Sequence, residues 1–494
     1  MAKIVVSGGG ICGLGASMML ARRGHEVTVL ERNPEEPPES IDKAWDAWER
    51  PGVAQFRMGH YFLARFHKII GAELPELFDR FDQAGALRIT PAIDAMPDSI
   101  ADRSPRPDDD QFRVITGRRP VFEWAVANAA AAEPRVDVRR GVAVTELLTG
   151  ASVEAGIPHV VGVRTDAGDD LHADLVIDAG GRRSAFGTWL AAIGGKPFFE
   201  HSEDSGFRYY GRYFRAGPNG WPGPQVPMIQ VLGSVALLSL PADNDTWMIG
   251  VVTSATDKAL YKLTDADAWR RVVAATPAIA PYLDGEPISE LETMAAIPDR
   301  YRRFIIDGAP VATGITAIAD AVAATNPMRG RGVSMGMLHA QAVINEIDAL
   351  DDPVDFARRV DAASEAELLP HFHATVEMDR DMRTAFDREV KGEAPPPPPA
   401  EEDPIAAMQA KFFSLIPSDP DVWRGFMKIV NVLDQPFNIV ASEPVLSKVL
   451  AYDGPIIHPL EGDGPARQEL VDIAAGAKSV AARMTRWDDL DAAN

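Results

Sequence analysis

The stretch KIVVSGGGICGLGASMMLARRGHEVTVLERN, residues 3–33, decides the fold of this chain. It begins with the apolar, β-branched run Ile4–Val6, which is typical of a buried parallel strand. Gly8, Gly10 and Gly13 follow with the spacing G-x-G-x-x-G. In that spacing the first glycine permits a tight turn, the second lets the backbone approach a pyrophosphate, and the third lets the next helix pack closely on the sheet.

A helix from Ala16 to Arg23 and a second strand, Glu26–Leu30, complete the unit. The N-terminus of such a helix presents unpaired N–H groups to phosphates. Glu31 stands at the tip of the second strand, where a carboxylate can accept both hydrogen bonds of an adenosine ribose. A glycine triplet alone is weak evidence, but strand, triplet, helix, strand and terminal acid in register predict an adenine-dinucleotide site.

Composition narrows the class of protein. At 494 residues the chain is long enough for two lobes and an extension. Its net charge of −23 argues against nucleic acid or an anionic membrane as a partner, since both attract basic surfaces. The lone Cys12 excludes a disulfide within the chain. The first strand begins so early that we expect no secretory leader, and apolar stretches such as Val231–Leu240 are about half the ~20 residues of a membrane span. The expected location is cytoplasmic.

Several further elements follow from periodicity and from glycine and proline positions. Residues 34–60 are expected to form a loop. Helices are expected over Phe62–Phe81, Gly117–Glu133, the segment after Gly332, residues 354–392 and Ile405–Leu450. Strands are expected over Val136–Arg139, Val142–Leu148, Val160–Thr165, Asp174–Asp178 and the start of Pro310–Asp320. The run Pro395–Pro399 should be a stiff extended spacer.

The texture of the chain changes between about 195 and 300. Alternating, aromatic-rich runs there predict an antiparallel sheet: Gly206–Arg215, Pro227–Leu240 and Thr246–Thr253. We therefore predict an α/β fold with an α+β insert. Its parts would be a Rossmann-like nucleotide-binding lobe over 1–194, an antiparallel-sheet substrate domain over 195–305, the return of the first lobe over 306–394, and a C-terminal helical extension over 400–494.

Two later segments match the glycine cradle in kind. They are DLVIDAGGRRS at 174–184, and GITAIADAVAATNPMRGRGVSMG at 314–336, where a strand leads to an aspartate and then to a glycine-rich turn that opens a helix. With the cradle, they make this chain resemble the FAD-dependent monooxygenases of the p-hydroxybenzoate hydroxylase fold. Within that group it looks most like bacterial epoxidases and hydroxylases related to squalene epoxidase and the polyether epoxidases. The likeness includes WERPGVAQFRMGH at 48–60, RPVFEW at 119–124 and DRYRRF at 299–304.

The resemblance implies FAD as the cofactor and assigns roles around it. Asp320 would hydrogen-bond the ribityl chain, and the helix start at Gly330–Val333 would point N–H groups at the N1–C2=O edge of the flavin. A helix N-terminus stabilises an anion, and reduced flavin carries negative charge at that edge. Arg119 would contact the phosphates or the ribityl region, and backbone near Val144 would border the adenine. The implied cofactor-binding residues are Gly8, Gly10, Gly13, Glu31, Arg32, Arg119, Val144, Asp320, Gly330, Gly332 and Val333.

Some of these assignments have plain structural alternatives. Asp320 could be a turn or helix-capping aspartate, Arg119 a solvated arginine in a first helical turn, and Arg32 a surface charge. One departure from the family also matters. Relatives that reduce their flavin with bound NADPH carry Ala-Asp-Gly in the middle segment, whereas this chain has Ala179-Gly180-Gly181. Direct use of nicotinamide is therefore in doubt, and NADPH or NADH would act either directly or through a separate flavin reductase.

The implied reaction is monooxygenation. The reduced flavin would react with O2 to give a C4a-hydroperoxide that transfers one oxygen atom to an apolar organic substrate, by epoxidation or hydroxylation. No metal is needed, and His371-x-His373 reads as a partly exposed helical pair. Candidates near the flavin come from Gln55, Arg57 and His60. His60 could donate a proton or shape the pocket, although a lone histidine is more often structural, and Arg57 could pair with a substrate carboxylate or the flavin.

Candidate substrate contacts are Tyr210, Arg212 and Met335. Tyr209, Tyr210, Arg212 and Tyr213 lie on one expected strand, whose alternate side chains should face the substrate cavity. Ordinary sheet packing explains them equally well. The methionines around the glycine-rich turn suggest a deformable apolar wall, with core packing as the alternative: Met328, Met335 and Met337. Cys12 is expected to be a packing residue.

Rival functions remain within reach of the same fold. A flavin halogenase is disfavoured because the expected Trp-x-Trp-x-Ile-Pro segment is absent. A prenyl-chain reductase would work without oxygen, and an escort protein would have no need for both Glu31 and Asp320. The expected partners are a small apolar substrate, O2, a flavin reductase in the two-component case and a second copy of the chain in a homodimer. The C-terminal helices could cover the cavity, mediate dimerisation or complete the fold.

Overall fold

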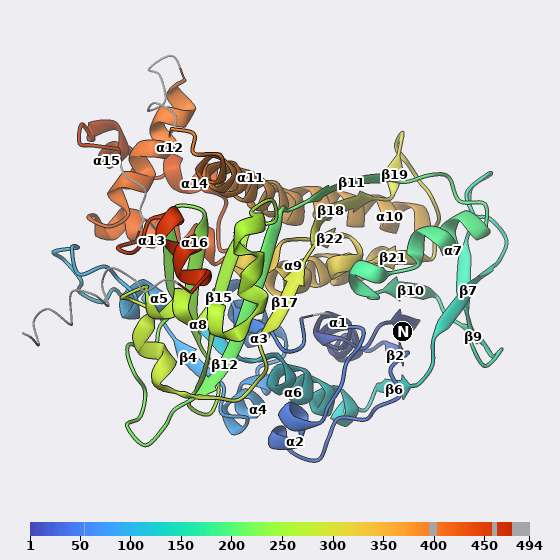
Figure 1. The fold of residues 1–494 in the computed structure, drawn as a ribbon. Coiled ribbons are helices and arrows are strands. Elements are labelled where there is room, and N and C mark those ends of the chain that lie inside the picture. The colour runs from blue at the N-terminus through green and yellow to red at the C-terminus, as the bar shows by residue number, and fades with distance from the viewer. Residues whose placement is uncertain (54, 395–402, 457–461, 477–494) are drawn as a thin grey trace, which may run out of the picture.

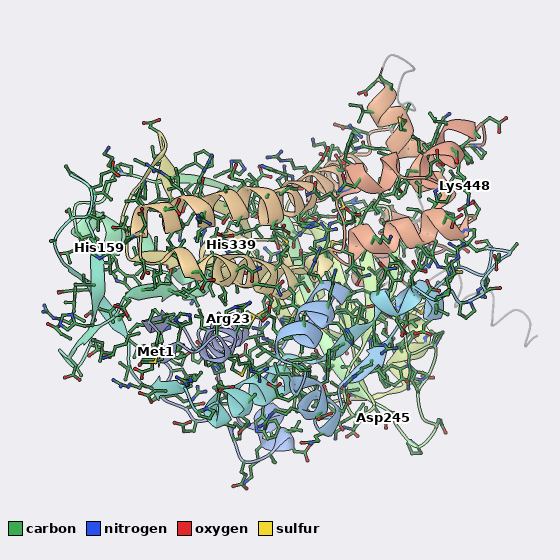
Figure 2. All side chains as sticks on the ribbon, turned by 180° about the vertical axis from the view of Figure 1, so that it is seen from behind. Met1, Arg23, His159, Asp245, His339 and Lys448 are labelled. Carbon is green, nitrogen blue, oxygen red and sulfur yellow. The ribbon has the colours of Figure 1, made fainter. Side chains whose placement is uncertain are left out.

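The computed structural model describes residues 1–53, 55–394, 403–456 and 462–476. An α/β lobe that contains the N-terminus lies at one end of the molecule, and a group of C-terminal helices lies at the other (Figure 1). A large antiparallel sheet lies between them. The side-chain view from behind places His159 and Lys448 at these opposite ends (Figure 2). The predicted spacer Pro395–Pro399 lies outside the described residues.

A five-stranded parallel sheet organises the first lobe. Its strand order is β21 (Ile315–Ala317), β10 (Leu175–Asp178), β1 (Lys3–Ser7), β2 (Glu26–Glu31) and β6 (Val136–Arg140). Val6 of the central strand is in register with Val29 on one side and Ile177 on the other. Because all five strands are parallel, their carboxyl ends meet at one edge, so three segments far apart in the sequence come together there.

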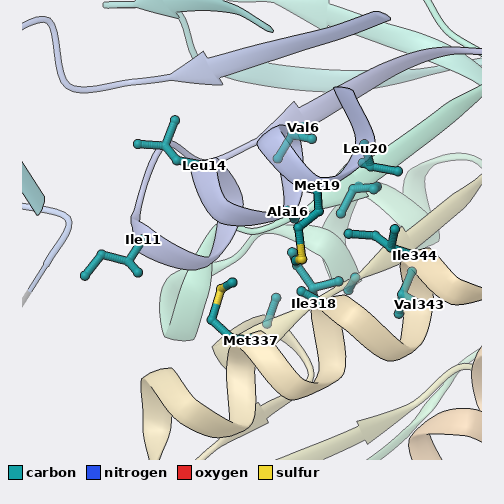
Figure 3. Close-up of a cluster of buried hydrophobic side chains, with 14 of the residues drawn as sticks. Val6, Ile11, Leu14, Ala16, Met19, Leu20, Ile318, Met337, Val343 and Ile344 are labelled. Atoms are coloured by element: carbon teal, nitrogen blue, oxygen red, sulfur yellow. The ribbon is translucent and has the colours of Figure 1, made fainter. Parts of the chain in front are cut away.

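Helices α1 (Ile11–Arg22) and α9 (Gly332–Asn345) pack directly against each other beside this sheet. The close-up of their apolar contacts shows Leu14 and Met19 of α1 on one side and Met337 and Ile344 of α9 on the other (Figure 3). Both helices are almost entirely buried, as helices that are hydrophobic all round should be. The first helix begins at Ile11, five residues before the predicted start, because the glycine-rich segment already adopts helical geometry.

The antiparallel sheet has the strand order β13 (Met228–Leu232), β14 (Val235–Pro241), β15 (Thr246–Ser254), β12 (Phe207–Arg215) and β16 (Glu286–Pro287), with β17 (Glu292–Ala295) also paired to β12. The predicted run over 227–240 is a hairpin of two strands, since the chain reverses at Gly233, which has a positive φ. One face of the sheet packs against α8 (Ala266–Ala274) and α16 (Arg467–Ala474). The other face turns toward the first lobe.

Residues 34–118 depart from the predicted elements. The expected loop contains α2 (Ile41–Asp46), whose N-cap is Ser40. The expected single helix over 62–81 is the end of strand β3 (Gly59–Phe62) followed by α3 (Ala64–Glu73) and α4 (Leu77–Gln83). Pro75 separates the two helices, because proline has no N–H to donate. Helix α6 (Arg119–Ala132) starts two residues later than predicted, since Gly117 belongs to strand β5 (Val114–Arg118).

The remaining strands form small sheets. These are β3 with β5 and β4 (Leu87–Ile89); β7 (Val144–Thr149), β8 (Val160–Thr165) and β9 (Asp170–His172); β11 (Phe199–Asp204), β18 (Pro298–Arg303) and β22 (Ala323–Ala324); and β19 (Ile305–Ile306) with β20 (Ala309–Pro310). Two short helices, α5 (Pro91–Asp94) and α7 (Phe186–Ala192), lie in the connections. The boundaries drawn between lobes from the sequence stay predictions.

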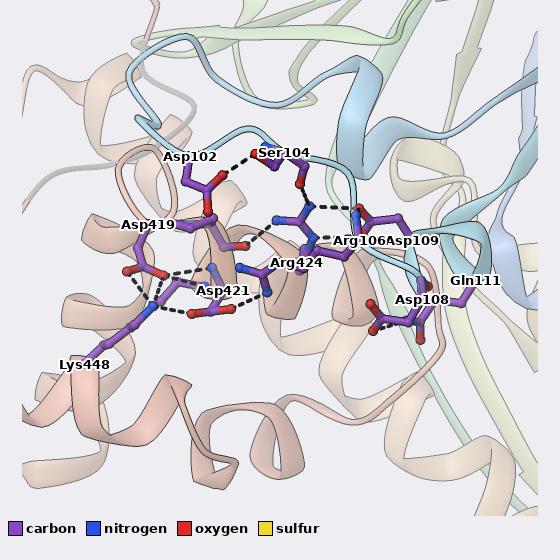
Figure 4. Close-up of polar contacts among 12 residues, drawn as sticks. Asp102, Ser104, Arg106, Asp108, Asp109, Gln111, Asp419, Asp421, Arg424 and Lys448 are labelled. Carbon is purple, nitrogen blue, oxygen red and sulfur yellow. Dashed lines mark hydrogen bonds and ion pairs between the residues drawn. The ribbon is translucent and has the colours of Figure 1, made fainter.

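From α9 onward the described residues are mainly helical, as predicted for the segment after Gly332, for 354–392 and for Ile405–Leu450. Helices α10 (Pro353–Ala363) and α11 (Leu369–Lys391) are joined by a π-helical turn, and the last group comprises α12 (Pro404–Leu415), α13 (Pro420–Val430), α14 (Pro436–Ala441) and α15 (Val445–Ala451). A polar network ties this group to residues 102–111 (Figure 4). Its centre is the buried pair between Arg424 and Asp109, whose Nε and Oδ1 atoms are 2.7 Å apart. None of the helices in the described ranges is long and apolar enough to cross a membrane.

The last helical group also touches the start of α9. The Arg331 guanidinium donates through Nη2 to the Ile429 carbonyl at 2.7 Å and through Nη1 to the Thr375 hydroxyl at 2.9 Å. The Ala64 N–H donates to Asn431 Oδ1 at 3.0 Å. The end of α13 is therefore bonded to the beginnings of α3 and α9.

Candidate functional site

The glycine loop after β1 has one backbone shape available to it. Gly8 has φ = +122°, and a Cβ there would collide with the Ala179 carbonyl. A Cβ on Gly13 would collide with the Gly8 carbonyl oxygen. Gly10 differs, because a Cβ on it would meet no atom within 4 Å. Two of the glycines are thus required by the fold itself, whereas Gly10 faces an open space in front of α1.

Glu31 closes one side of this loop. Its Oε2 accepts from the Gly9 N–H at 3.0 Å and from Arg50 Nη2 at 2.9 Å, and its Oε1 accepts from the Asn33 N–H at 2.9 Å. The carboxylate is buried, and Arg50 also donates to the Gly9 carbonyl at 3.2 Å. A carboxylate has about four acceptor positions, so Oε1 retains one for a further hydroxyl.

The same arginine extends the network into α6. Arg50 Nη1 lies 3.3 Å from Glu123 Oε2, and Arg119 donates through Nε to Glu123 Oε1 at 2.8 Å. The Glu123 side chain is fully buried and that of Arg50 is 3% exposed. Arg119, expected to touch the cofactor, is therefore bound to Glu123. Glu123 in turn contacts Arg50, which bonds to Glu31.

The Asp320 carboxylate faces the opening from the other side. Its Oδ2 accepts from Arg182 Nε at 3.2 Å, and Arg182 also donates to the Thr325 carbonyl at 2.7 Å. A Cβ on Gly332 would lie 3.9 Å from Asp320 Oδ1, so this second oxygen points toward the first turn of α9. Asp320 is one-third exposed, which leaves Oδ1 accessible to a ligand.

The beginnings of α1 and α9 lie side by side at this opening. A Cβ on Gly336 would lie 2.8 Å from Cys12 Sγ, and one on Gly15 would lie 2.8 Å from Met337 Cε. Both helices therefore present their free N–H groups to one space, which favours an anionic ligand. Burial, followed by the nearby Asp320 charge, raises the pKa of the Cys12 thiol to about 12. The thiol stays protonated, consistent with a packing role.

The segment Ala179-Gly180-Gly181, where relatives carry Ala-Asp-Gly, leaves little room for a side chain at position 180. The Asp178 carboxylate folds back beneath its own turn and accepts hydrogen bonds from the Gly180 N–H at 2.9 Å and from the Ser184 hydroxyl. A Cβ on Gly180 would lie 2.9 Å from Asp178 Oδ1. Burial raises the pKa of Asp178 to about 6. An aspartate at 180 would thus be crowded against a second carboxyl, so this chain keeps its acid two residues earlier.

The loop before β3 holds the predicted catalytic candidates Gln55 and Arg57, and the third candidate, His60, lies within β3 itself. His60 Nδ1 lies 2.9 Å from the Met58 carbonyl, and burial lowers the pKa of this imidazole to about 3, so it is neutral. Arg57 donates to the Trp45 and Trp48 carbonyls and stacks over Trp45, 4.9 Å from the ring centroid. Burial lowers the pKa of Arg57. Gln55 is half-buried, and the catalytic roles of all three stay predictions.

The tyrosines of β12 alternate between the two faces of the large sheet. Tyr209 and Tyr213 face the first lobe: the Tyr209 hydroxyl donates to Asn326 Oδ1 and the Tyr213 hydroxyl to the Met58 carbonyl at 3.3 Å. Tyr210 lies on the opposite face, in the core against α8, and donates to the Leu260 carbonyl. Arg212, in the same alternation, donates to the Ser289 carbonyl at 2.8 Å. The predicted substrate contacts Tyr210 and Arg212 are therefore not brought to the face that meets the first lobe.

The other predicted residues separate in the same way. Met328 packs in the cluster with Tyr209 and Tyr213, whereas Met335 is 1% exposed in the core of the first lobe. Arg32 is exposed, and Val144 begins β7 near the backbone that bonds Glu31. His371 is buried and His373 exposed, so they do not form a pair, and within the described ranges no group of three metal-ligating side chains gathers.

Four charged residues of the site receive no role from the sequence: Arg50, Glu123, Arg182 and Arg140. Arg50 contacts Glu31 and Glu123, and Arg182 contacts Asp320, from loops far away in the chain. Arg140 is the fourth: it pairs in register with Glu31 on the neighbouring strand, and its Nη1 is buried without a hydrogen-bond partner among the described residues. The strand predicted over Val136–Arg139 points to this sheet edge, but it stops one residue short of Arg140, the last residue of β6.

Comparison with known proteins identifies the fold. No family model matches the sequence. The chain is 25% identical over 475 residues to Protein Rv3254 of Mycobacterium tuberculosis, covering 91% of this chain and 93% of that protein. Among solved structures it is similar to the Diels-Alderase PyrE3 of pyrroindomycin biosynthesis, with a TM-score of 0.57, 16% identity and coverage of 87% of this chain and 80% of that one. It is also similar to pqsL, a probable FAD-dependent monooxygenase from Pseudomonas aeruginosa, with a TM-score of 0.57, 17% identity and coverage of 79% and 98%.

These likenesses show the fold that the sequence predicted. The chain has the architecture of the p-hydroxybenzoate hydroxylase type, in which a Rossmann-like lobe carries an inserted antiparallel sheet. The closer resemblance to epoxidases stays a prediction.

Proposed function

We propose that this chain is a flavin-dependent monooxygenase that binds FAD and transfers one oxygen atom of O2 to a small apolar molecule. One observation carries the proposal. Gly10, on which a Cβ would meet no atom within 4 Å, caps the N-terminus of α1, and α1 packs through Cys12 against α9, whose first residue Gly332 lies next to Asp320 Oδ1. Two helix N-termini and one acceptor fit a ligand that carries both phosphates and a polyol chain.

The residues present fit the adenosine, pyrophosphate and ribityl parts of FAD. At the adenosine end, Glu31 Oε1 has a free acceptor position and Arg140 Nη1 a free donor, which match a ribose hydroxyl and a phosphate. At the pyrophosphate, Gly10 offers space and α1 its N–H groups. At the ribityl chain, Asp320 Oδ1 accepts a hydroxyl while Arg182 holds Oδ2 in place.

When bound and reduced, FAD supplies the reaction with O2, in which one oxygen atom goes to the substrate and the other to water. The chain supplies a dry, electrostatically prepared site. The N-terminus of α9 stabilises negative charge on the reduced ring. The aromatic side chains Trp45 and Tyr213 would exclude water from the face of the large sheet that meets the first lobe.

The electron donor follows from the middle segment. With Gly180 in place of an aspartate and Asp178 turned under its own backbone, the chain offers no carboxylate at the position where relatives carry one. We therefore propose that a separate flavin reductase delivers reduced FAD, with NADPH or NADH as its source of electrons.

The first experiment is the visible spectrum of the purified full chain after incubation with FAD. We expect a flavoprotein spectrum for the wild type and none for Gly10→Val, whose side chain enters the open space. Gly217→Val is the matched control, because a Cβ there also meets no atom within 4 Å and its φ is not positive. A flavin spectrum in Gly10→Val, or its loss in both variants, would contradict the assignment of the opening.

The second experiment follows bleaching of bound FAD without oxygen. We expect little bleaching with NADPH or NADH alone and rapid bleaching when a flavin reductase is added. Bleaching by NADPH alone would make the chain a self-sufficient enzyme and overturn the two-component proposal. A protein that folds but binds no FAD would instead favour an escort role.

A further inference from the structure

Two glycines face each other at the centre of the large sheet. Gly211 of β12 is in register with Gly250 of β15. The same row continues to Leu238 of β14 on one side and to Glu292 of β17 on the other. Residues in register point to the same side of a sheet, so this row is a floor without side chains between Leu238 and Glu292.

Side chains rise on both sides of that floor. The row before it contains Tyr209 and Val252, and the row after it contains Tyr213 and Met248. All four belong to the cluster that faces the first lobe. The glycine pair is therefore the base of a trough with aromatic and aliphatic walls.

The ends of two methionine side chains fill the trough over Gly211, and Leu238 covers Gly250, where a Cβ would lie 3.0 Å from Leu238 Cγ and 3.2 Å from Met248 Cε. A Cβ on Gly211 would lie 3.1 Å from Met248 Sδ and 3.2 Å from Met58 Cε. A Cβ on Gly59 would lie 2.8 Å from Met248 Cε, and the Gly59 N–H lies 2.9 Å from Met248 Sδ. Methionine is unbranched and rotates easily, so it vacates such a space at lower cost than a branched residue.

Met58 also borders solvent. It lines an open pocket of about 270 Å³ between residues 48–53 and 56–58 on one side and strand β17 on the other. Met294 and Glu292 line the same pocket from the sheet, and Arg57 and Phe56 line it from the loop. Met58 thus stands between the pocket and the glycine floor, with an ionisable rim outside it and an apolar interior behind it.

The polar groups of the walls are already engaged. The Tyr209 hydroxyl donates to Asn326 and the Tyr213 hydroxyl to the Met58 carbonyl. A ligand in the trough would therefore find aromatic faces, aliphatic groups and sulfur. Met328, in the turn just before α9, packs in the same cluster, which places the trough next to the opening assigned to the cofactor.

We propose that Met58 and Met248 are the gate of the substrate site, and that the ligand they admit is a flat, uncharged ring system that lies on the Gly211–Gly250 floor. The proposal rests on the proposed function for the reaction but names the substrate class from the trough itself. A flat molecule fits because only glycine lets a ring approach the strand backbone this closely. The two methionines move outward as the ring enters from the pocket.

The test uses naphthalene as a flat, uncharged probe and calorimetric titration of the full chain with FAD added. Met58→Ala leaves the trough partly empty, so we expect naphthalene to bind roughly tenfold or more tightly than to the wild type. Gly211→Val places a side chain on the floor and should abolish naphthalene binding both in the wild type and in the Met58→Ala variant. Met427→Ala, which truncates a buried methionine of the C-terminal cluster, is the control for methionine removal in general.

Unchanged affinity in a folded Met58→Ala variant, or binding that survives Gly211→Val, would overturn the gate. If Met58→Ala does not fold, Met248→Ala makes the same test from the wall side. The visible spectrum separates the two proposals. A wild type without bound flavin that still shows this pattern of naphthalene binding refutes the proposed function and leaves the gate standing. Bound flavin with no effect of any variant refutes the gate alone.

Discussion

The glycine loop of the first lobe and the glycine floor of the large sheet use the same residue in opposite ways. At the loop, a Cβ on Gly8 or Gly13 would strike backbone atoms that cannot move. At the floor, a Cβ on Gly211 would first meet the thioether ends of Met58 and Met248, and a Cβ on Gly250 would meet Leu238 and Met248, all of them side chains. The first arrangement fixes one shape, whereas the second yields to whatever enters. The proposed function calls for this difference, because its cofactor would stay bound while its substrate would enter and leave.

The two regions also differ in how their surroundings hold them. Buried ion pairs brace the loop, from Glu31 through Arg50 to Glu123. The floor is surrounded by an apolar cluster and methionine sulfur. Hydrogen-bonded ion pairs fix the orientation of the groups they join, whereas methionine side chains fill space and can change conformation. Single substitutions in each region test whether the loop is rigid and the floor adaptable.

The largest effect should come from the rigid glycine. Gly13→Val places a side chain against the Gly8 carbonyl, separates α1 from the sheet and should abolish FAD binding. The measurement is bound flavin per protein after gel filtration. Gly211→Ala, whose Cβ meets only mobile methionine ends, should retain full flavin occupancy. A folded Gly13→Val protein that still binds FAD would show that the glycine loop is not rigid.

The next effect concerns the braces of the loop. Glu123→Gln removes the charge that Arg50 and Arg119 share in a fully buried position, and breaking such a pair costs roughly 3–5 kcal/mol of unfolding free energy. Urea unfolding of the variant measures it. The control is Asp137→Asn, which removes the partner of the exposed Arg139 and should change little. Equal losses in both variants would show that burial does not distinguish these pairs.

Asp320→Ala should have an intermediate effect on the cofactor alone. A hydrogen bond to a charged group contributes roughly 1.5–3 kcal/mol, so the dissociation constant for FAD should rise roughly 10- to 100-fold. Equilibrium dialysis with FAD gives the constant. Unfolding stability should change much less, because Asp320 is one-third exposed. Normal flavin retention would remove Asp320 from the proposed site.

The smallest effect is a dependence on pH at the border between the two regions. Asp299 accepts the Asn326 N–H at 2.6 Å, and burial raises its pKa from 3.8 to about 7. Because the folded state holds this proton more tightly than the unfolded state, the resulting stability is complete below about pH 4 and falls as pH rises toward 7. Above pH 7 it is gone. Asp299→Asn should flatten that decline in urea-unfolding measurements, and an unchanged slope would assign it to another group.

Local signals predicted the rigid region well and the adaptable region less well. Strand β1, the glycine spacing, β10 and β21 could all be located, because each is an apolar run followed by glycine or an acid within a few residues. Arg50 and Glu123 could not, since they meet across 73 residues and no spacing rule connects them. The face reached by Tyr210 required the strand register, which periodicity alone does not fix.

The hydrogen bonds from Arg331 to Ile429 and from Ala64 to Asn431 can form only late in the synthesis of the chain. The guanidinium at the start of α9 waits for a carbonyl that lies 98 residues further along the chain. At a synthesis rate of roughly 5–20 residues per second, that interval lasts roughly 5–20 s. During this time the nascent chain already contains both glycine-rich helix starts, but the hydrogen bond from Arg331 to Ile429 has not yet formed. A nascent chain stalled before Ile429 should therefore contain both glycine-rich helix starts while Arg331 still lacks this carbonyl partner.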